Sequence, residues 1–428
     1  MNNRHKKIFL ACLILLLLVD ASFIFFNKSI QAYSQLLIIS SFIYLITILL
    51  LNKTSLTKTH LISAIFFFFL LKLLFITVDP IGSDDYYRYL WDGKVQASGI
   101  NPFLYSPNDK NLDSLHSGLL PEKVSYPHIR TIYFPVSQIL FTVAYWISGE
   151  SAVGLKIILF FAELLILISL YYLLLRFSID MKYILIYAAL PLIIFQFFID
   201  AHIDLVGVSL LLVSVTLYFY DKKLFSYILL GLSISVKPTG LLLIPFLFQN
   251  EQKLANKLKS VFIPVFIFIL TFLPYAFTAT PLDTLINYSA NWTFNGMIYN
   301  VLSLFFTENL TVRIFCGIFF LFVYIFLFTL KIDFLKKVYL SLFLLMIFSP
   351  VTHPWYLIWF AAFLPVIRSC SGIYFVSAIS LTSITVVAFQ LTGIWQENIF
   401  ILLGQYLPLV VIFFYELIKE RFWAKQIA

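Results

Sequence analysis

Long apolar runs separated by short polar breaks cover most of the chain. Most of them approach the about 20 residues that a helix needs to cross a bilayer, and they are too long for barrel strands. Because only helices and closed barrels satisfy their backbone in lipid, the pattern predicts one all-α, polytopic membrane domain over residues 1–428. The runs lie at about 8–26, 33–51, 60–78, 131–148, 154–176, 182–199, 203–220, 224–248, 259–277, 311–330, 336–349, 354–368, 372–392 and 396–418.

One long polar segment interrupts this pattern, at residues 79–130. A connection of about fifty residues is unusually long, and loops of that length are usually functional or disordered. Its tyrosines and tryptophan favour order, because disordered segments are poor in aromatic residues. We therefore expect a first outer loop with surface helices, extending over residues 79–148, which carries part of an active site.

The basic residues predict how the chain crosses the membrane, because lysine and arginine accumulate in cytoplasmic loops. The N-terminal MNNRHKK is placed inside, and three spans then place segment 79–130 outside. The later basic clusters stay cytoplasmic if 131–148 does not cross and 224–248 is a re-entrant helical hairpin, which Pro238 and Gly240 support by breaking its helix. About twelve full spans and two cytoplasmic termini follow. Those clusters are Arg176/Lys182, Lys222/Lys223, Lys253/Lys257/Lys259, Lys331/Lys336/Lys337, Arg368 and Lys419/Arg421/Lys425.

Composition agrees with a chain solvated by lipid: 61% of residues are hydrophobic, 12% are charged and the mean hydropathy is +0.95. The net charge of +8 would suggest a nucleic-acid partner in a soluble protein, but here it is explained by the cytoplasmic loops. Cys12, Cys316 and Cys370 lie far apart without metal-ligand spacing, so neither a disulfide framework nor a metal site is expected. The first apolar run is long and lacks a cleavage site, which favours a retained span over a signal peptide.

With this topology, ionisable and aromatic residues collect on the outer face, whereas the cytoplasmic loops receive mainly basic residues. Chemistry is therefore expected on the outer side. The outer residues are Asp84, Asp85, Arg88, His128, Tyr133, Asp200, His202, Asp204, Lys237 and His353.

The adjacent acids Asp84 and Asp85 have two interpretations. Ser83 before them is a good N-cap, acids in a first turn favour the helix dipole, and Gly99 suits the end of such a helix. Two neighbouring carboxylates repel each other, however, and at a membrane surface desolvation raises a carboxylate pKa toward that of a useful base. Arg88, one turn later, is placed to pair with Asp84 or to bind an anion.

The other outer polar residues also have structural alternatives. Asp200, His202 and Asp204, in DAHID, exceed what a turn needs, and a metal site there has only weak support. Lys237 lies in an apolar stretch, where a lysine marks a functional site by default, with snorkelling to the headgroups as the alternative. His353 is either a site residue or a helix cap.

Three tryptophans lie at predicted outer boundaries. Trp91, Trp292 and Trp355 fit the interfacial aromatic belt of membrane proteins. Trp292, within NYSANWTFNG, is also a candidate for lining a sugar site.

Five stretches resemble a known enzyme superfamily. GSDDYYRYLWDGKVQASGINPFLYSPND, TIYFPVSQ, DAHIDL, SVKPTGLLLIP and HPWY are similar to segments of the C-type (GT-C) glycosyltransferases, most of all bacterial glycosyltransferase family 87 and related mannosyltransferase-like proteins. That resemblance implies a GT-C helical bundle that takes a hexose, expected to be mannose, from a polyprenyl-phosphate donor. The acceptor would be a lipid-linked or cell-envelope glycan, outside a bacterial inner membrane.

The resemblance also implies residue roles, with no metal or other cofactor required. Either acid of the adjacent pair, Asp84 or Asp85, would be the general base. A second group would orient the substrate: Asp200, His202, Asp204, His128 and Tyr133. The donor phosphate would be held by Lys237, Arg88 and His353.

Two other function classes are compatible with such a chain. A flippase or transporter would place ionisable residues at mid-membrane and show related halves, neither of which the sequence shows. A glycan polymerase or ligase would use the same outer cavity to join whole lipid-linked chains.

Overall fold

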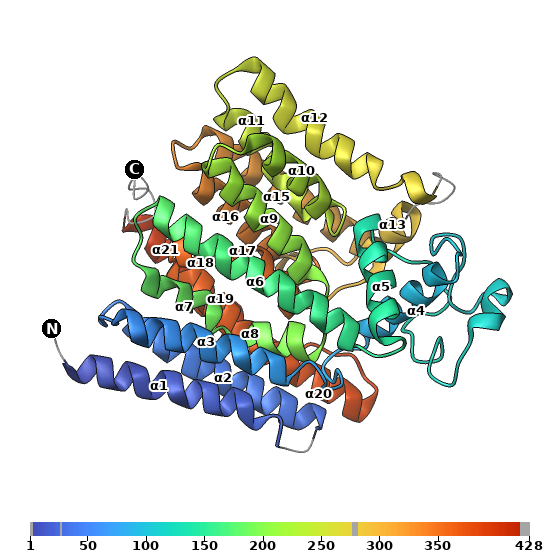
Figure 1. Ribbon diagram of the computed structural model, residues 1–428, viewed down its shortest axis with the longest axis horizontal. Coiled ribbons are helices and arrows are strands. Elements are labelled where there is room, and N and C mark those ends of the chain that lie inside the picture. The colour runs from blue at the N-terminus through green and yellow to red at the C-terminus, as the bar shows by residue number, and fades with distance from the viewer. Residues whose placement is uncertain (1–2, 26–27, 276–280, 420–428) are drawn as a thin grey trace. The chain divides into compact units, whose positions relative to one another are not determined.

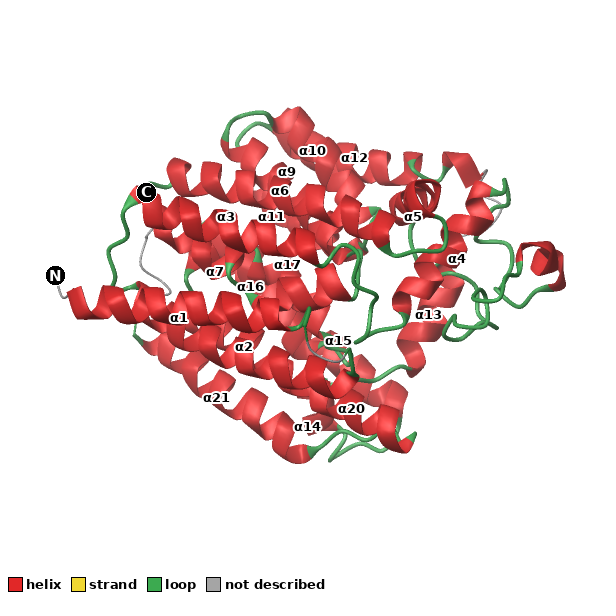
Figure 2. Cartoon of the chain, turned by 60° about the horizontal axis from the view of Figure 1, so that its bottom comes forward, coloured by secondary structure: helices red, strands yellow, loops and turns green. Residues whose placement is uncertain are grey.

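The computed structural model describes residues 3–25, 28–275 and 281–419, and over these ranges the chain consists of helices and loops with two isolated β-bridges (Figure 2). It divides into two compact units. The first unit contains residues 1–82, 167–196 and 293–428, and the second contains residues 83–166 and 197–292. The all-helical part of the fold prediction is confirmed.

The second unit begins with the polar segment and continues through a series of helices. Its elements are α4 (Asp85–Ala97), η1 (Lys110–Leu115), α5 (Pro135–Ser148), the first part of α6 (Val153–Arg176), α9 (Asp204–Phe219), α10 (Lys223–Ile234), η4 (Pro238–Leu243), α11 (Ile244–Asn250), α12 (Leu254–Leu270), η5 (Leu273–Tyr275) and α13 (Leu282–Asn291). α4 packs on α5, and α10 packs on both α9 and α12 (Figure 1).

The first unit combines long helices with several short ones. They are α1 (Asn3–Ser22), α2 (Ile30–Leu51), α3 (Lys58–Leu74), η2 (Met181–Ile184), α7 (Leu185–Ala188), α8 (Pro191–Ile193), η3 (Ile194–Ile199), α14 (Met297–Leu302), α15 (Asn309–Thr329), α16 (Phe334–Phe348), η6 (Pro354–Leu357), α17 (Ile358–Ala361), α18 (Leu364–Ile367), α19 (Cys370–Ala378), η7 (Ile379–Leu381), α20 (Thr382–Thr392) and α21 (Ile399–Ile418).

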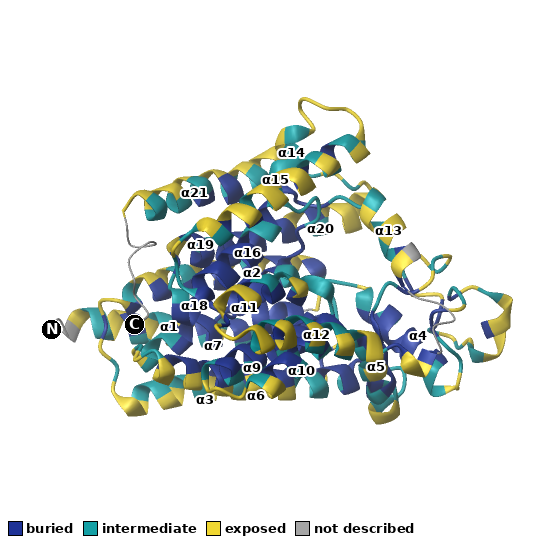
Figure 3. Ribbon diagram, turned by 90° about the horizontal axis from the view of Figure 1, so that it is seen from above, coloured by how far each residue is buried: buried dark blue, intermediate teal, exposed yellow. Residues whose placement is uncertain are grey.

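Six helices in the described part of the chain are long and apolar enough to cross a membrane. A pair bent by 46°, Met181–Ala188 with Pro191–Ile199, is either a broken seventh span or a re-entrant loop. Large apolar side chains are exposed along α15 and α21 (Figure 3), as expected of lipid-facing surfaces. The protein is therefore a membrane protein, but the expected twelve spans are not confirmed. Prolines are one reason, because Pro191, Pro238 and Pro354 each begin a short helix within an apolar run, and Pro365 is the second residue of another.

Two apolar runs form helices too short for ordinary spans. The run at 131–148 becomes α5, which has 14 residues, and the run at 224–248 becomes α10, a turn, η4 and α11. A turn at Pro238 is what the sequence predicted. The surface helices expected in the long polar segment are likewise present, as α4 and η1.

α4 and α5 approach each other closely because α4 has a glycine, Gly93, at the point of contact. A Cβ atom added to Gly93 would lie 2.3 Å from the Phe141 carbonyl oxygen of α5. Next to this contact, the rings of Tyr89 and Phe141 stack with centroids 4.7 Å apart. The long polar segment is thereby fixed on a helix pair, and the first turn of α4 carries the two adjacent acids.

Candidate active site

The two adjacent acids lie at the start of α4. Asp84 occupies the N-cap position but makes no capping bond, and the helix begins at Asp85. Ser83 was expected as the N-cap; instead its hydroxyl accepts a 3.3 Å bond from the Asp85 backbone N–H. Ser125 donates a hydrogen bond to the Asp84 carboxylate. The expected helix end is confirmed at Gly99. Its φ is 81°, a conformation that glycine adopts without strain because it has no Cβ atom.

The DAHID turn brings a second set of polar side chains to the same place. Asp200, His202 and Asp204 are each at most 4% exposed, and α9 begins at Asp204. Between the first two, Ala201 has a φ of 62°, a left-handed conformation that is unfavourable for residues with a Cβ. Backbone strain such as that of Ala201 persists where surrounding contacts fix the backbone, often at functional sites. From the same turn, His202 Nδ1 lies 3.6 Å from the Asp85 carboxylate.

Lys237 joins the cluster from the break between α10 and η4. Its Nζ donates a 2.7 Å hydrogen bond to Asp204, and its side chain is 29% exposed. The lysine forms an ion pair within the protein, whereas snorkelling would have directed it to the lipid headgroups. The predicted convergence of the adjacent acids, the DAHID turn and Lys237 is therefore present in one unit.

Burial and the neighbouring charges change the pKa values of Asp85 and Lys237. Desolvation by the surrounding protein raises the pKa of Asp85 to about 7, with further increases from the charges of Asp84, Asp204 and Asp200 and a decrease from Lys237. Burial also lowers the pKa of Lys237, against the opposing effect of Asp204 and Asp85. The Asp85 side chain keeps 35% of its surface exposed. It is therefore accessible to a substrate and titrates near neutral pH.

Arg88 has a different partner from the one expected. Its Nε donates a 2.9 Å bond to Asp92, one turn further along α4, and Nη1 donates to the Ile129 carbonyl at 3.1 Å. Gln138 of α5 donates to both Asp92, at 3.0 Å, and Thr131, at 2.9 Å. The expected pairing with Asp84 was wrong. Arg88 instead joins α4 to the end of the polar segment.

Tyr133 and His128 are both in the second unit but in different surroundings. The Tyr133 ring packs edge-to-face on Tyr89, with centroids 5.0 Å apart. Burial and the charge of Asp85 raise the pKa of Tyr133. His128 lies beside Tyr126, with centroids 6.3 Å apart. Tyr133 therefore borders the acid cluster, whereas His128 lines the pocket described below.

Two other residues that the sequence singled out have mainly aromatic surroundings. His353 belongs to the first unit, where its ring stacks on Trp355 with centroids 4.2 Å apart and on Phe294 at 4.8 Å. It stands at the N-cap position of η6 without a side-chain capping bond. Trp91 is 1% exposed beside His116, so its expected place in an aromatic belt was wrong.

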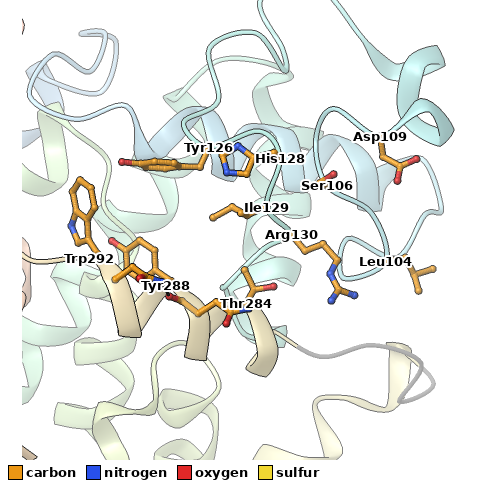
Figure 4. Close-up of a pocket in the computed structure, with 12 residues that line it drawn as sticks. Leu104, Ser106, Asp109, Tyr126, His128, Ile129, Arg130, Thr284, Tyr288 and Trp292 are labelled. Carbon is orange, nitrogen blue, oxygen red and sulfur yellow. Dashed lines mark hydrogen bonds between the residues drawn. The ribbon is translucent and has the colours of Figure 1, made fainter. Parts of the chain in front are cut away.

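A pocket of about 700 Å³ opens between the polar segment and α13 (Figure 4). This volume falls within the range of small-ligand sites. Sequence reasoning found His128 and Trp292 but missed the other residues, although NYSANW places polar and aromatic groups at helical spacing. The pocket is lined by Leu104, Ser106, Asp109, Tyr126, His128, Ile129, Arg130, Thr284, Asn287, Tyr288, Asn291 and Trp292.

Over the described ranges, no three carboxylate, imidazole or thiol groups are grouped so as to hold a metal ion. The metal interpretation of DAHID therefore gains no support from the geometry.

Removal of the Arg88 side chain should destabilise the second unit. Arg88→Ala leaves Asp92 buried without its cation, which typically costs about 3–5 kcal/mol, so the thermal unfolding temperature in detergent should fall markedly. Arg88→Ala/Asp92→Ala should cost less than the sum of the two single changes. Lys94→Ala, which breaks the less buried pair with Glu150, is the control. Equal small shifts for both cations would contradict a structural role of Arg88.

A comparison with protein families gives a match that covers more than half of the chain. A family model described as alpha-(1->6)-mannopyranosyltransferase, N-terminal domain (the MptA_B family), matches residues 16–250, more than half of the 428-residue chain. No curated protein and no solved structure gives a significant match. The matched range contains the whole acid cluster and Lys237, and it confirms the predicted mannosyltransferase resemblance. The chain belongs to the alpha-(1->6)-mannopyranosyltransferase family.

Proposed function

We propose that this protein transfers mannose from a polyprenyl-phosphate donor to the 6-hydroxyl of a mannoside acceptor, with Asp85 as the general base. The position of Asp85 is the observation that carries the proposal. It is accessible, it titrates near neutral pH and it lies beside His202 in a cluster containing Lys237. A base poised near the working pH is the efficient one for accepting a hydroxyl proton.

Asp85 is a better candidate for the base than its neighbour. Asp84 accepts a hydrogen bond from Ser125, so its carboxylate already has a partner within the protein. Its charge in turn raises the pKa of Asp85. Asp84 therefore tunes the base, and His202, at 3.6 Å, keeps the Asp85 carboxylate in position.

The reaction we propose is a single displacement. The acceptor oxygen forms a bond to the anomeric carbon of mannose while the bond from that carbon to the phosphate oxygen breaks. The hydroxyl proton passes to Asp85, and the electron pair of the broken bond leaves with the polyprenyl monophosphate. Lys237 then stabilises the growing negative charge, and fixed cations in a water-poor site do this more effectively than bulk water. A single displacement inverts the anomeric configuration.

The location of the reaction rests on the charge pattern. Basic clusters between the apolar runs favour cytoplasmic termini, about twelve crossings and an extracytoplasmic site. Six helices meet the length and hydropathy requirements in the described ranges, so the remaining crossings would use shorter or broken helices. These are stable at membrane depth where they are buried in protein or line a polar cavity. We propose the bacterial inner membrane as the site.

Replacement of Asp85 should abolish most of the transfer. Asp85→Asn removes the proton acceptor and should lower kcat by about 10²–10⁴-fold, measured with radiolabelled polyprenyl-phosphate mannose and an alkyl α-mannoside in lipid vesicles. Asp84→Asn should retain far more activity. Asp113→Asn, an exposed acid of the same polar segment, is the matched control. Full activity in Asp85→Asn would rule out this assignment of the base.

The transfer rate should depend on pH in a defined direction. Because Asp85 acts when deprotonated and its pKa is about 7, kcat/KM should rise through about pH 7 and level off above it. Asp84→Asn removes a like charge that raises this pKa, so its midpoint should move to lower pH. Asp113→Asn should leave the midpoint unchanged. A wild-type profile that is flat between pH 5 and pH 9 would contradict the assignment.

The donor phosphate should depend on Lys237 and not on a divalent ion. Lys237→Gln keeps a donor for Asp204 but removes the charge, so kcat/KM for the donor should fall by roughly 10²-fold, in the range of a lost charge-stabilising group. Lys237→Arg should recover part of it. Wild-type transfer should survive a chelator. Activity abolished by the chelator and restored by one divalent ion would replace this account of phosphate binding.

A further inference from the structure

Three aromatic rings form one end of the pocket between the polar segment and α13 (Figure 4). Tyr126 meets Trp292 edge-to-face with centroids 5.9 Å apart, and Tyr288 stacks on Trp292 at 6.3 Å. Aromatic faces carry negative charge density, which attracts the polarised C–H groups on the flat side of a pyranose ring. The three rings offer such faces at the wall of an accessible pocket.

The helical wall of the pocket supplies polar groups beside these rings. Asn287, Tyr288 and Asn291 lie three, four and seven residues after Thr284, which places all four on one face of α13. Asn291 donates a 2.8 Å bond to the Asn287 carbonyl, which orients its amide. Side-chain amides both donate and accept hydrogen bonds, as sugar hydroxyls require.

The position of Tyr126 involves a strained backbone. Its φ is 53°, in the left-handed region that bulky residues rarely adopt. Two bonds hold the bend: Ile129 N–H donates to the Tyr126 carbonyl at 3.1 Å, and Asn108 N–H donates to the Pro127 carbonyl at 3.1 Å. Strain of this kind is maintained at binding sites, where it fixes a side chain in a useful position.

The aromatic end of the pocket is also the end connected to the acids. Ser125, the residue before Tyr126, donates a hydrogen bond to Asp84, the neighbour of Asp85. In agreement with this contact, burial and then the charge of Asp85 raise the pKa of Tyr288. A sugar bound against the rings would thus have its hydroxyl groups close to Asp85. Of the lining residues, Leu104 and Ile129 are the aliphatic ones, so the wall does not suit a polyprenyl chain. Its combination of rings and amides suits a neutral glycan.

We propose that this pocket is the acceptor subsite, which holds a short mannan chain with its terminal mannose against Tyr126, Tyr288 and Trp292. This proposal rests on the mannosyl transfer proposed above and adds the place and the polymer length of the acceptor. The terminal residue faces Asp85, and the preceding residues extend between the polar segment and the polar face of α13. An acceptor of two or three mannoses should therefore bind better than one.

The test compares Trp292→Ala with Trp146→Ala, which removes an exposed tryptophan of α5 that does not line the pocket. Transfer is measured with octyl α-mannoside and with the octyl glycosides of α-1,6-mannobiose and α-1,6-mannotriose. We expect Trp292→Ala to raise the acceptor KM about tenfold, equivalent to about 1.4 kcal/mol. Donor KM should stay within about twofold, as should both constants of Trp146→Ala.

Direct binding separates this proposal from the proposed activity. Saturation-transfer NMR with α-1,6-mannotriose, without donor, should show contacts in wild type and Trp146→Ala that are weakened in Trp292→Ala. Binding lost with Trp292 in a protein that transfers no mannose would support the glycan subsite and count against the activity. Transfer by wild type with unchanged acceptor KM and binding in a folded Trp292→Ala would overturn the subsite alone. Equal KM values for all three acceptors would overturn the proposed polymer length.

Discussion

The structure of the site depends on one constraint, the close packing of several acids with a single lysine among them. Lys237 pairs with Asp204 at 2.7 Å, whereas Asp85 has the imidazole of His202 at 3.6 Å and the like charges of Asp84, Asp204 and Asp200 near it. Desolvation and these like charges raise the pKa of Asp85. Different surroundings thus distinguish identical side chains: Asp204 holds the cation, and Asp85 is the acid that we propose as the base.

Irregular backbone makes this arrangement available. A regular helix would spread the side chains of DAHID or of SVKPTG around its axis, but both segments lie at helix breaks, at Ala201 and before Pro238. Each break exposes backbone groups and costs stability. The same feature makes several apolar runs shorter than a full membrane span. Site geometry and the low number of long helices therefore have a common origin.

Sequence reasoning succeeded where one physical rule acted over long distances. The charge pattern, together with the helix break at Pro238, predicted that Asp85, His202 and Lys237 would lie on one face of the membrane, because the positive-inside rule constrains every loop simultaneously. The structure groups these residues in one cluster. Sequence reasoning failed for Arg88, where Asp84 and Asp92 are equally distant along the helix and only burial beside Gln138 selects the second. Tyr126 was missed for a similar reason: nothing in its local sequence indicates a φ of 53°.

Lys237 also connects the two halves of the proposed reaction. Its charge lowers the pKa of Asp85 in the free protein. An anion that pairs with Lys237 would weaken this effect, and the charge on a departing phosphate grows as its bond to mannose breaks. The proton affinity of Asp85 would then rise during the same step in which the acceptor hydroxyl must lose its proton. Interactions that strengthen toward the transition state accelerate the chemical step, whereas uniform binding does not. The electrostatic influence of Lys237 on Asp85 would therefore contribute to catalysis in the proposed reaction as well as to the packing of the cluster.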